Sequence, residues 1–338
     1  FRIPDLVFNI LIAGAISSAF IPIFLEARKT DEKKSWQIAS NFMNVRFVAL
    51  LVISIVLIIF APYVVKFVAP GFGYKKLDLT VELTRIIFLS PLLLSLSAIF
   101  SGILHSFKRF AAYALAPILY NLGIIFGALV LSDFWGVHGL AWGVVLGASA
   151  HLLIQLPSVR FSGFKWSPVF RPSDMHFRKI LKLMIPRSIG LAAFQINLWV
   201  ITAIASTRFI GSVAIFNLAN NIQYIPIGII GISYATAAFP SLSKSAAGKD
   251  MDKFWKEFKK SFFLVLSFSF AASAAMFVFR ELIADWILGV GKFNHLNVRV
   301  VANLLEFFAL GIVAHSIIPV ISRAFYALQN TVIPVAIN

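Results

Sequence analysis

Residues 226–243 read PIGIIGISYATAAFPSLS, and a comparable stretch near the start, residues 4–24, reads PDLVFNILIAGAISSAFIPIF. Both are as apolar as a membrane span, yet both carry proline and glycine, which are costly inside a helix in water. In a bilayer these residues are tolerated, because neighbouring helices or water in a cavity satisfy the backbone groups that they free. The two stretches therefore favour transmembrane helices that contain breaks.

The composition of the chain also indicates a membrane protein. Hydrophobic residues make up 59% of the 338 residues and charged residues 13%, whereas a soluble domain averages about 25% charged residues. No segment alternates with the period of a barrel strand, so we predict an all-α polytopic membrane protein. The chain contains no cysteine, which excludes disulfide frameworks and thiolate metal sites.

Apolar runs of about 20 residues, the length that crosses a hydrocarbon core of about 30 Å, recur along the chain. No basic segment precedes the first run, so no signal peptide is predicted, and the chain reads as a fragment at both ends. A further span is only begun at Thr331. The runs predict nine helices, at residues 3–25, 42–69, 81–105, 111–132, 136–157, 180–207, 213–240, 261–288 and 299–322.

The distribution of lysine and arginine predicts the orientation. One set of alternate loops carries 19 of the 30 basic residues and the opposite set carries 6. Cytoplasmic loops are the richer ones, so we attribute the formal net charge of +16 to them and not to nucleic-acid binding. The first set comprises residues 26–41, 105–110, 159–182, 243–260 and 322–331, and the second comprises 70–80, 132–138, 207–213 and 280–299.

Two of the basic segments also look amphipathic. GFKWSPVFRPSDMHFRKILK (163–182) is basic and aromatic, and MDKFWKEFKKSF (251–262) spaces three phenylalanines four residues apart among lysines. Both are typical of surface helices that lie on an anionic leaflet. Solvated charged linkers are the alternative.

An internal repeat divides the chain. Sliding the sequence along itself until Pro22 falls on Pro240 also places Ala19 on Ala237, and nearly the same shift places Pro117 on Pro334. We predict two parallel-repeat lobes around a central cavity: a first lobe at 1–158, a cytoplasmic amphipathic linker at 159–179 and a truncated second lobe at 180–338.

Transporters commonly bind substrate between such repeats, in helices interrupted by proline and glycine. This favours a gating role for the helix breakers, and ordinary tolerance of these residues in spans is the alternative. The candidate helix-break or gating residues are Pro4, Pro22, Pro226, Gly228, Gly231 and Pro240.

Five stretches carry a family resemblance. They are RIPDLVFNILIAGAISSAFIPIF (2–24), APGF (69–72), KRFAAYALAPILYN (108–121), QINLWV (195–200) and FNLANNIQYIPIGIIGISYATAAFPSLSKS (216–245). With these the chain resembles, over its whole length, the MurJ/MviN lipid II flippases of the multidrug/oligosaccharidyl-lipid/polysaccharide exporter superfamily.

The resemblance implies about fourteen spans, of which this chain carries the second to the tenth and the start of the eleventh. It implies a V-shaped pair of lobes in the bacterial cytoplasmic (inner) membrane. It also implies that lipid II, the undecaprenyl-pyrophosphate-linked peptidoglycan precursor, moves from the cytoplasmic to the outer leaflet by alternating access. The family's cavity arginines correspond to Phe8, Asn9 and Asn221, so this chain lacks those three charges.

A pyrophosphate headgroup needs cationic or amide donors, and a charge inside a span is expensive unless it faces a cavity. Arg187 and Arg46 meet that requirement, although Arg187 could instead extend to the interface beside Lys182. The alternative for the amides is hydrogen bonding between helices. The candidate substrate-binding residues are Arg187, Arg46, Asn221, Asn217, Asn220, Asn9, Gln195 and Asn197.

Other polar or small residues within spans have weaker functional interpretations. Arg85 and the Arg2–Asp5 pair lie near the outer surface. Gly139, Gly143 and Gly147 form a small-residue ladder that predicts close helix packing. Three ionisable groups could relay protons, or be satisfied by neighbouring helices: His151, Glu306 and His315.

We expect no catalytic residue, metal or cofactor, with transport driven by the membrane potential or a cation gradient. The expected partners are lipid II, membrane lipids and proteins of cell-wall synthesis. The alternatives are a drug or cation antiporter, or another polyprenyl-linked oligosaccharide flippase of the superfamily. A membrane glycosyl- or phosphotransferase would need clustered carboxylates, and a non-transporting scaffold is favoured by the missing arginines.

Overall fold

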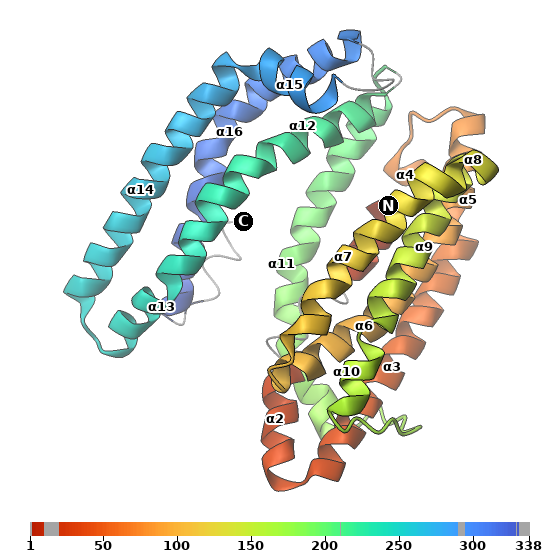
Figure 1. Cartoon of the computed structure of the whole chain (residues 1–338), viewed down its shortest axis with the longest axis vertical. Helices are drawn as coiled ribbons and strands as arrows, with labels where there is room; N and C mark the ends of the chain where they lie inside the picture. The colour runs from red at the N-terminus through yellow and green to blue at the C-terminus, as the bar shows by residue number, and fades with distance from the viewer. Residues whose placement is uncertain (1, 10–19, 210, 290–294, 329, 331–338) are drawn as a thin grey trace. The chain divides into compact units, whose positions relative to one another are not determined.

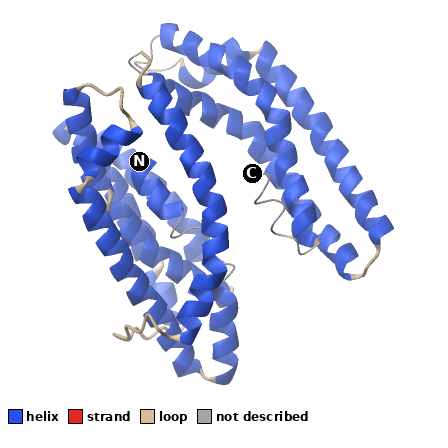
Figure 2. Cartoon of the chain, turned by 180° about the vertical axis from the view of Figure 1, so that it is seen from behind, coloured by secondary structure: helices blue, strands red, loops and turns tan. Residues whose placement is uncertain are grey.

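The computed structural model describes residues 2–9, 20–209, 211–289, 295–328 and 330, and within them the regular structure is entirely helical (Figures 1 and 2). The chain forms two compact units, unit 1 (Phe1–Thr207) and unit 2 (Arg208–Asn338). The prediction of an all-α fold is confirmed.

Within the described residues, seven helical segments are long and apolar enough to cross a bilayer, and they match seven of the nine predicted spans. Part of the span predicted at 3–25 lies outside the described residues. The span predicted at 180–207 belongs to one continuous helix. The seven segments are Glu32–Ile59, Tyr74–Ser106, Phe110–Trp135, Val137–Phe161, Ser212–Ala247, Met251–Val278 and Leu296–Ala327.

Unit 1 is built around two apolar clusters, one toward each end of α3. One contains Phe24, Trp36 and Phe42, and the other contains Leu50 and Phe88. The helical elements of unit 1 are α1 (Arg2–Phe8), α2 (Ile21–Thr30), α3 (Glu32–Ile59), α4 (Ala61–Val68), α5 (Tyr74–Ile87), α6 (Leu89–Ser106), α7 (Phe110–Phe126), the π-helical turn η3 (Gly127–Leu131), α8 (Ser132–Trp135), α9 (Val137–Leu153), α10 (Leu156–Phe161) and α11 (Met175–Ser206).

Unit 2 is organised by one buried stripe on its last helix. Val301, Leu305, Ala309 and Ile312 recur every three or four residues and are fully buried, so one face of that helix forms the core. The elements of unit 2 are α12 (Ser212–Pro226), the π-helical turn η4 (Ile227–Ile232), α13 (Ser233–Ala247), α14 (Met251–Val278), α15 (Arg280–Leu288) and α16 (His295–Ala327).

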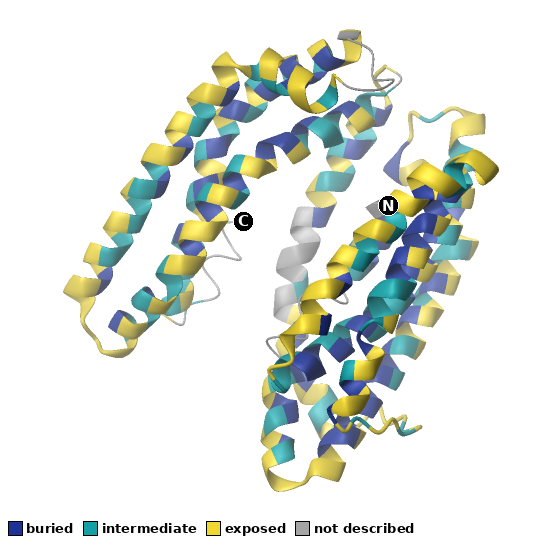
Figure 3. Cartoon of the chain, in the orientation of Figure 1, coloured by how far each residue is buried: buried dark blue, intermediate teal, exposed yellow. Residues whose placement is uncertain are grey.

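Apolar side chains also cover outward surfaces of both units. α7 is exposed along most of its length, including Ile118, Leu122 and Ile125, each about half exposed (Figure 3). α14 exposes Phe263, Phe268 and other phenylalanines in the same way. In a membrane protein such surfaces face lipid tails, so their exposure agrees with the seven spans.

The basic segments of unit 1 gather at one end of the unit. The α2–α3 turn and the segment before α11 lie at its lower end in Figure 1, whereas α4 and α8 lie at the upper end. In unit 1, the α2–α3 turn and the segment before α11, which are predicted to be cytoplasmic, therefore share one end.

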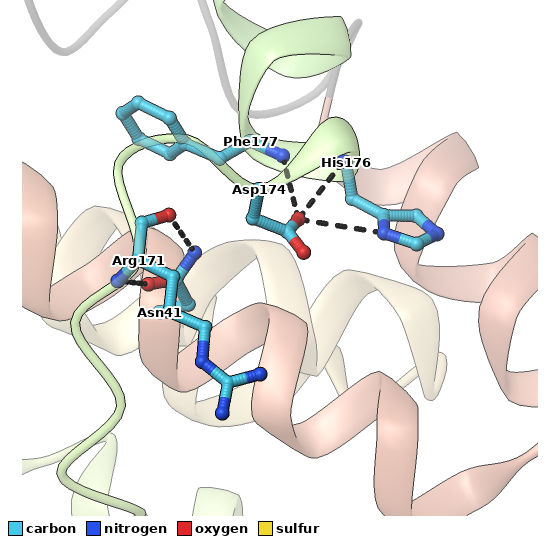
Figure 4. A network of polar contacts seen from close by, with 5 residues as sticks. All are labelled: Asn41, Arg171, Asp174, His176 and Phe177. Carbon is cyan, nitrogen blue, oxygen red and sulfur yellow. Dashed lines mark hydrogen bonds and ion pairs between the residues drawn. The ribbon is translucent and has the colours of Figure 1, made fainter.

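The segment at 163–182 does not form the predicted surface helix. Residues 163–174 are non-helical and helix begins only at Met175, because Gly163 has φ +87° and the two prolines interrupt any helix (Figure 2). We call residues 163–174 the strap. Asp174 ends it and caps α11, since its Oδ1 accepts hydrogen bonds from the backbone N–H of His176 and of Phe177 (Figure 4).

Side chains of α3 hold the strap. Asn41 Nδ2 donates to the Arg171 carbonyl at 3.0 Å and Asn41 Oδ1 accepts from the Arg171 N–H at 2.6 Å (Figure 4). Asn44 Nδ2 donates to the carbonyls of Ser167 and Val169, both at 2.9 Å. The two asparagines supply the partners that a helix would have supplied internally.

The second amphipathic segment, 251–262, is helical but is not a separate surface helix. It forms the first turns of α14, which runs unbroken from Met251 to Val278 after an N-cap at Asp250. The lysines of this segment therefore lie on the extension of a membrane span.

Helix α11 is fastened to unit 1. At its outer end the N–H of Gly71 donates to Ser206 Oγ at 3.1 Å, and a Cβ on Gly71 would lie 2.6 Å from Thr207 Cα. At its start the strap joins it to α3. The unit boundary at Thr207 therefore differs from the predicted lobe boundaries at 158 and 180, which stay a prediction about the sequence repeat.

The predicted close packing at the glycine ladder is confirmed between α7–η3 and α9. A Cβ on Gly143 would lie 2.5 Å from Gly127 Cα, and one on Gly127 would lie 2.6 Å from Gly143 Cα. Gly139 and Gly147 likewise meet backbone atoms of Leu131 and Tyr120. Absent side chains let the two backbones touch.

We predict that Gly143→Ala destabilises the protein by about 1–3 kcal/mol, because the added methyl group must force the two backbones apart. Gly73→Ala is the matched control, since a Cβ there meets no atom within 4 Å. The measurement is the thermal unfolding midpoint in detergent. Equal midpoints for the two variants would contradict the packing role.

Candidate functional site

Arg46 is a buried cation in the middle of unit 1. It lies one helical turn from Phe42 and one from Leu50, between the two apolar clusters, with a side chain only 7% exposed. Its guanidinium carbon lies 5.5 Å from the centroid of the Phe42 ring, which is a cation–π distance. A buried cation in a membrane-spanning helix can bind an anionic group.

The α11 candidates lie on one helix at different depths. The backbone of Arg187 is helical, but its side chain lies outside the described residues. Gln195 is 6% exposed whereas Asn197 is exposed. One turn after Gln195, Trp199 packs against the apolar cluster that contains Leu50 and Phe88, which we call the outer apolar cluster. Gln195 therefore faces into unit 1 and Asn197 does not.

The two candidate positions on α1 differ in character. Phe8 packs against the outer apolar cluster. Asn9 Nδ2 donates to the Asp5 carbonyl at 2.9 Å, so one of its two amide protons is already used within α1. The backbone turns π-helical at Asn9, and the shift that aligns Pro22 with Pro240 places Asn9 on Ile227, the first residue of η4.

The asparagines of α12 belong to unit 2. Asn221 is exposed, and Asn217 and Asn220 are half-buried. Sequence reasoning missed Gln223, which is 4% exposed and donates from Nε2 to the Phe308 carbonyl of α16 at 2.9 Å. Gln223 could have been predicted from the sequence, because it is one more amide in the polar run that contains the asparagines of α12.

The predicted break in α12–α13 is a π-helical turn. Pro226 ends α12 and Ile227–Ile232 forms η4, which widens the helix without unwinding it. Gly231 is required for packing, because a Cβ there would lie 2.6 Å from Ser316 Cα on α16. A Cβ on Gly228 would meet no atom within 4 Å.

The remaining candidate prolines sit inside continuous helical elements. Pro4 and Pro22 lie in the first turns of α1 and α2, where a missing N–H costs least. Pro240 is inside α13, which continues past it to Ala247.

His151 is satisfied by a neighbouring helix, which is one of the two predicted roles. Its Nδ1 lies 2.6 Å from Ser97 Oγ of α6. Gln155 Nε2 donates both to Ser97 Oγ, at 2.6 Å, and to the His151 carbonyl, at 3.1 Å. Ser101 completes the network by donating to Gln155 Oε1 at 2.9 Å. This polar group holds α9 against α6.

The other ionisable groups are an ion-paired acid within α16, an exposed histidine and residues near helix ends. Glu306 Oε2 pairs with Arg280 Nη2 at 3.4 Å, and His315 is exposed. Arg85 donates from Nε to the Ile58 carbonyl at 3.2 Å. This hydrogen bond pairs one of the carbonyl groups that the C-terminal end of α3 leaves without a partner within the helix. In the predicted Arg2–Asp5 pair, the Arg2 side chain lies outside the described residues.

The described candidates thus fall into two sets. Unit 1 carries Arg46 on α3, Asn9 directly after α1, and Gln195 and Asn197 on α11, and unit 2 carries the asparagines of α12. Buried arginine and amide groups in membrane-spanning helices can bind a phosphate-bearing molecule through charge-assisted and neutral hydrogen bonds.

Curated proteins resemble the chain along its length. The chain is 31% identical over 339 residues to "Probable lipid II flippase MurJ" of Buchnera aphidicola subsp. Acyrthosiphon pisum (strain APS), covering 99% of the chain and 66% of that protein. It is 31% identical over 348 residues to "Probable lipid II flippase MurJ" of Rhizobium tropici, covering 99% of the chain and 64% of that protein. The chain therefore spans about two thirds of the length of these relatives.

Solved structures share the fold. "Lipid II flippase MurJ, inward closed conformation" superposes with a TM-score of 0.84 at 24% identity, covering 99% of the chain and 69% of that structure. An inward-facing MATE-family multidrug transporter of the MOP superfamily gives a TM-score of 0.80 at 15% identity, covering 98% and 77%. At these identities the likeness shows the transporter fold alone.

A family model described as "Lipid II flippase MurJ" matches residues 1–338. The chain belongs to the MurJ family, whose members are multi-pass proteins of the bacterial inner membrane.

Proposed function

We propose that this chain is the membrane core of a lipid II flippase, which moves the lipid-linked peptidoglycan precursor from the cytoplasmic to the outer leaflet by alternating access. The single observation that carries the proposal is the family match along all 338 residues. The relatives named above are lipid II flippases by name and extend beyond this chain, so the activity proposed is that of the whole protein.

The family is one of transporters. We propose that the chain makes and breaks no covalent bond and uses no catalytic residue, metal or cofactor. The driving force would be the membrane potential, which acts on any net charge that crosses with the cargo, or a cation gradient. The proposed partners are lipid II, the surrounding lipids and proteins of cell-wall synthesis.

Recognition of the pyrophosphate is proposed to rest on few charges. The family resemblance implies arginines at the positions of Phe8, Asn9 and Asn221, and one amide proton of Asn9 already binds the Asp5 carbonyl. Arg46 and Arg187 would supply the remaining positive charge. Because neutral amide bonds are about half as strong as charge-assisted ones, each remaining arginine should matter more than in the family at large.

We predict that Arg46→Ala/Arg187→Ala weakens lipid II binding about ten- to a hundredfold, since a hydrogen bond to a charged group contributes about 1.5–3 kcal/mol. Native mass spectrometry of the detergent-solubilised chain measures the bound lipid. Arg85→Ala is the matched control, because it removes an arginine that already bonds the Ile58 carbonyl at the end of α3.

The position of Arg46 over Phe42 requires a second control. Arg46→Met keeps the apolar stem and removes the charge, so it separates packing from recognition. The thermal midpoint of each variant is measured beside its lipid binding. If the double alanine variant folds and retains lipid II as the parent does, the pyrophosphate is not held by these arginines.

We also predict that Asn221→Arg tightens lipid II binding about tenfold, because it restores a charge-assisted donor on an exposed face of α12. Tighter binding should slow release, so lipid II exposure on the outer leaflet should fall in a flippase-depleted strain rescued with the full-length variant. Asn221→Gln is the matched control, because it keeps a neutral amide at the same position. Unchanged affinity in Asn221→Arg would place the headgroup away from this face.

A drug or cation antiporter is the second candidate, favoured by the fold likeness to a MATE-family transporter. That activity would require an acidic group in a cavity, whereas the described acid Glu306 in α16 is paired with Arg280. Another polyprenyl-linked oligosaccharide flippase and a scaffold also remain proposals. Binding of lipid II in preference to undecaprenyl phosphate and to cationic dyes separates the lipid II flippase from all three.

A further inference from the structure

The geometry of α3 gives the depth of the strap. The outer end of α3 is marked by Phe60 and by α4, whose Tyr63 and Phe67 lie largely exposed beside Lys66, as in an interfacial belt. A hydrocarbon core of about 30 Å takes about 20 residues at 1.5 Å each. Counting back from Ile59 reaches the neighbourhood of Ser40.

Ser40, Asn41 and Asn44 are the residues that bind the strap. The strap therefore lies at the level of the predicted cytoplasmic interface, where lipid headgroups meet the hydrocarbon. By contrast, the tip of α3 at Lys33 and Lys34 extends about two helical turns beyond Ser40. At the rise of a helix this distance is roughly 10 Å.

The side chains of the strap sort into two sets. Phe164 faces inward and packs edge-on to Trp36 and Phe100, at 5.6 Å and 5.9 Å between ring centroids. The exposed side chains include two cations and two aromatic rings, each cation next to a ring in the sequence: Lys165, Trp166, Phe170 and Arg171.

Trp166 is held in a fixed orientation although its side chain is 58% exposed. Its Nε1 donates to Asn44 Oδ1 at 2.9 Å. Because the N–H is satisfied inside the protein, the indole ring can enter an apolar environment without losing a hydrogen bond.

The charge of Arg171 is directed outward. Its backbone is bound to Asn41, and in Figure 4 its guanidinium lies apart from the carboxylate of Asp174, which caps α11. The backbone of the strap is thus fixed at several points while its cations point to the surroundings.

We propose that the strap is a binding site for the headgroups of anionic phospholipids of the cytoplasmic leaflet. Lys165 and Arg171 contact the phosphates, and Trp166 and Phe170 enter the interface between them. Opposite charge and interfacial aromatic rings together specify an anionic lipid surface. The asparagine clip, Asn41 with Asn44, pre-organises the site, so little conformational entropy is lost on binding. The inference does not depend on the identity of the cargo.

The test compares two double variants with the same change in net charge. Lys165→Gln/Arg171→Gln removes both strap cations, and Lys33→Gln/Lys34→Gln removes two cations at the exposed tip of α3. The chain is titrated in neutral detergent with phosphatidylglycerol, with phosphatidylcholine and with inorganic phosphate. Native mass spectrometry counts bound lipid, and the thermal midpoint reports stabilisation.

We expect the strap variant to bind phosphatidylglycerol about tenfold more weakly than the parent, since each basic residue near an anionic surface contributes appreciably to attraction. The α3-tip variant should lose clearly less affinity than the strap variant, because its lysines lie about one Debye length, roughly 10 Å, beyond that interface and their attraction is therefore partly screened. Phosphatidylcholine binding should not differ among the proteins.

A third variant, Asn44→Ala, removes half of the clip and leaves all the charges. It should weaken phosphatidylglycerol binding while the chain stays folded, as judged by its thermal midpoint. Equal losses in the two charge variants would show diffuse attraction and overturn the proposal, as would an unchanged strap variant. Competition by inorganic phosphate at millimolar concentration would identify a free-phosphate site instead of a lipid site.

Discussion

A backbone N–H or C=O inside hydrocarbon has no water to bind, and this constraint shapes each unit of the protein. The spans are helices because a helix satisfies its own backbone, and where Pro226 interrupts the ladder the chain forms a π-helical turn without opening. In the described part of unit 1 the irregular strap lies at the end of the unit, where Asn41 and Asn44 supply its hydrogen bonds.

The same constraint explains the close contact of α7 with α9. Association of helices in lipid gains little from the hydrophobic effect, so it depends on backbone proximity and on a few polar contacts. Gly127 and Gly143 allow the close approach of the backbones. Ser97 and His151 provide a polar contact between α6 and α9. Glycine contacts and a few polar contacts thus stabilise the association of these helices, a role that apolar burial has in a soluble core.

Much of the fold could be predicted from the sequence, because the length of an apolar run is a local property. The helix ends could not: α14 begins at Met251, well before its apolar part, since hydropathy marks the bilayer and not the helix. The prediction of a helix in the strap was wrong because two prolines in the segment interrupt a helix, and the binding of its backbone by Asn41 and Asn44 could not be predicted because they lie far earlier in the chain. For the candidate site, the sequence predicts which residues are polar. It does not predict the hydrogen bond of Asn9 to the Asp5 carbonyl or the burial of Gln223, because both depend on the neighbours in the folded structure.

Because α11 is bound to the rest of unit 1 at both of its ends, the contacts determine where the chain can be divided into two fragments. A polypeptide tolerates a break where few contacts cross it. A break after Thr207 leaves the Gly71–Ser206 hydrogen bond and the whole strap within one piece. A break at the predicted lobe boundary, between residues 158 and 180, would instead separate α11 from the helices that hold both of its ends. Two co-expressed fragments of this protein should therefore be divided after Thr207.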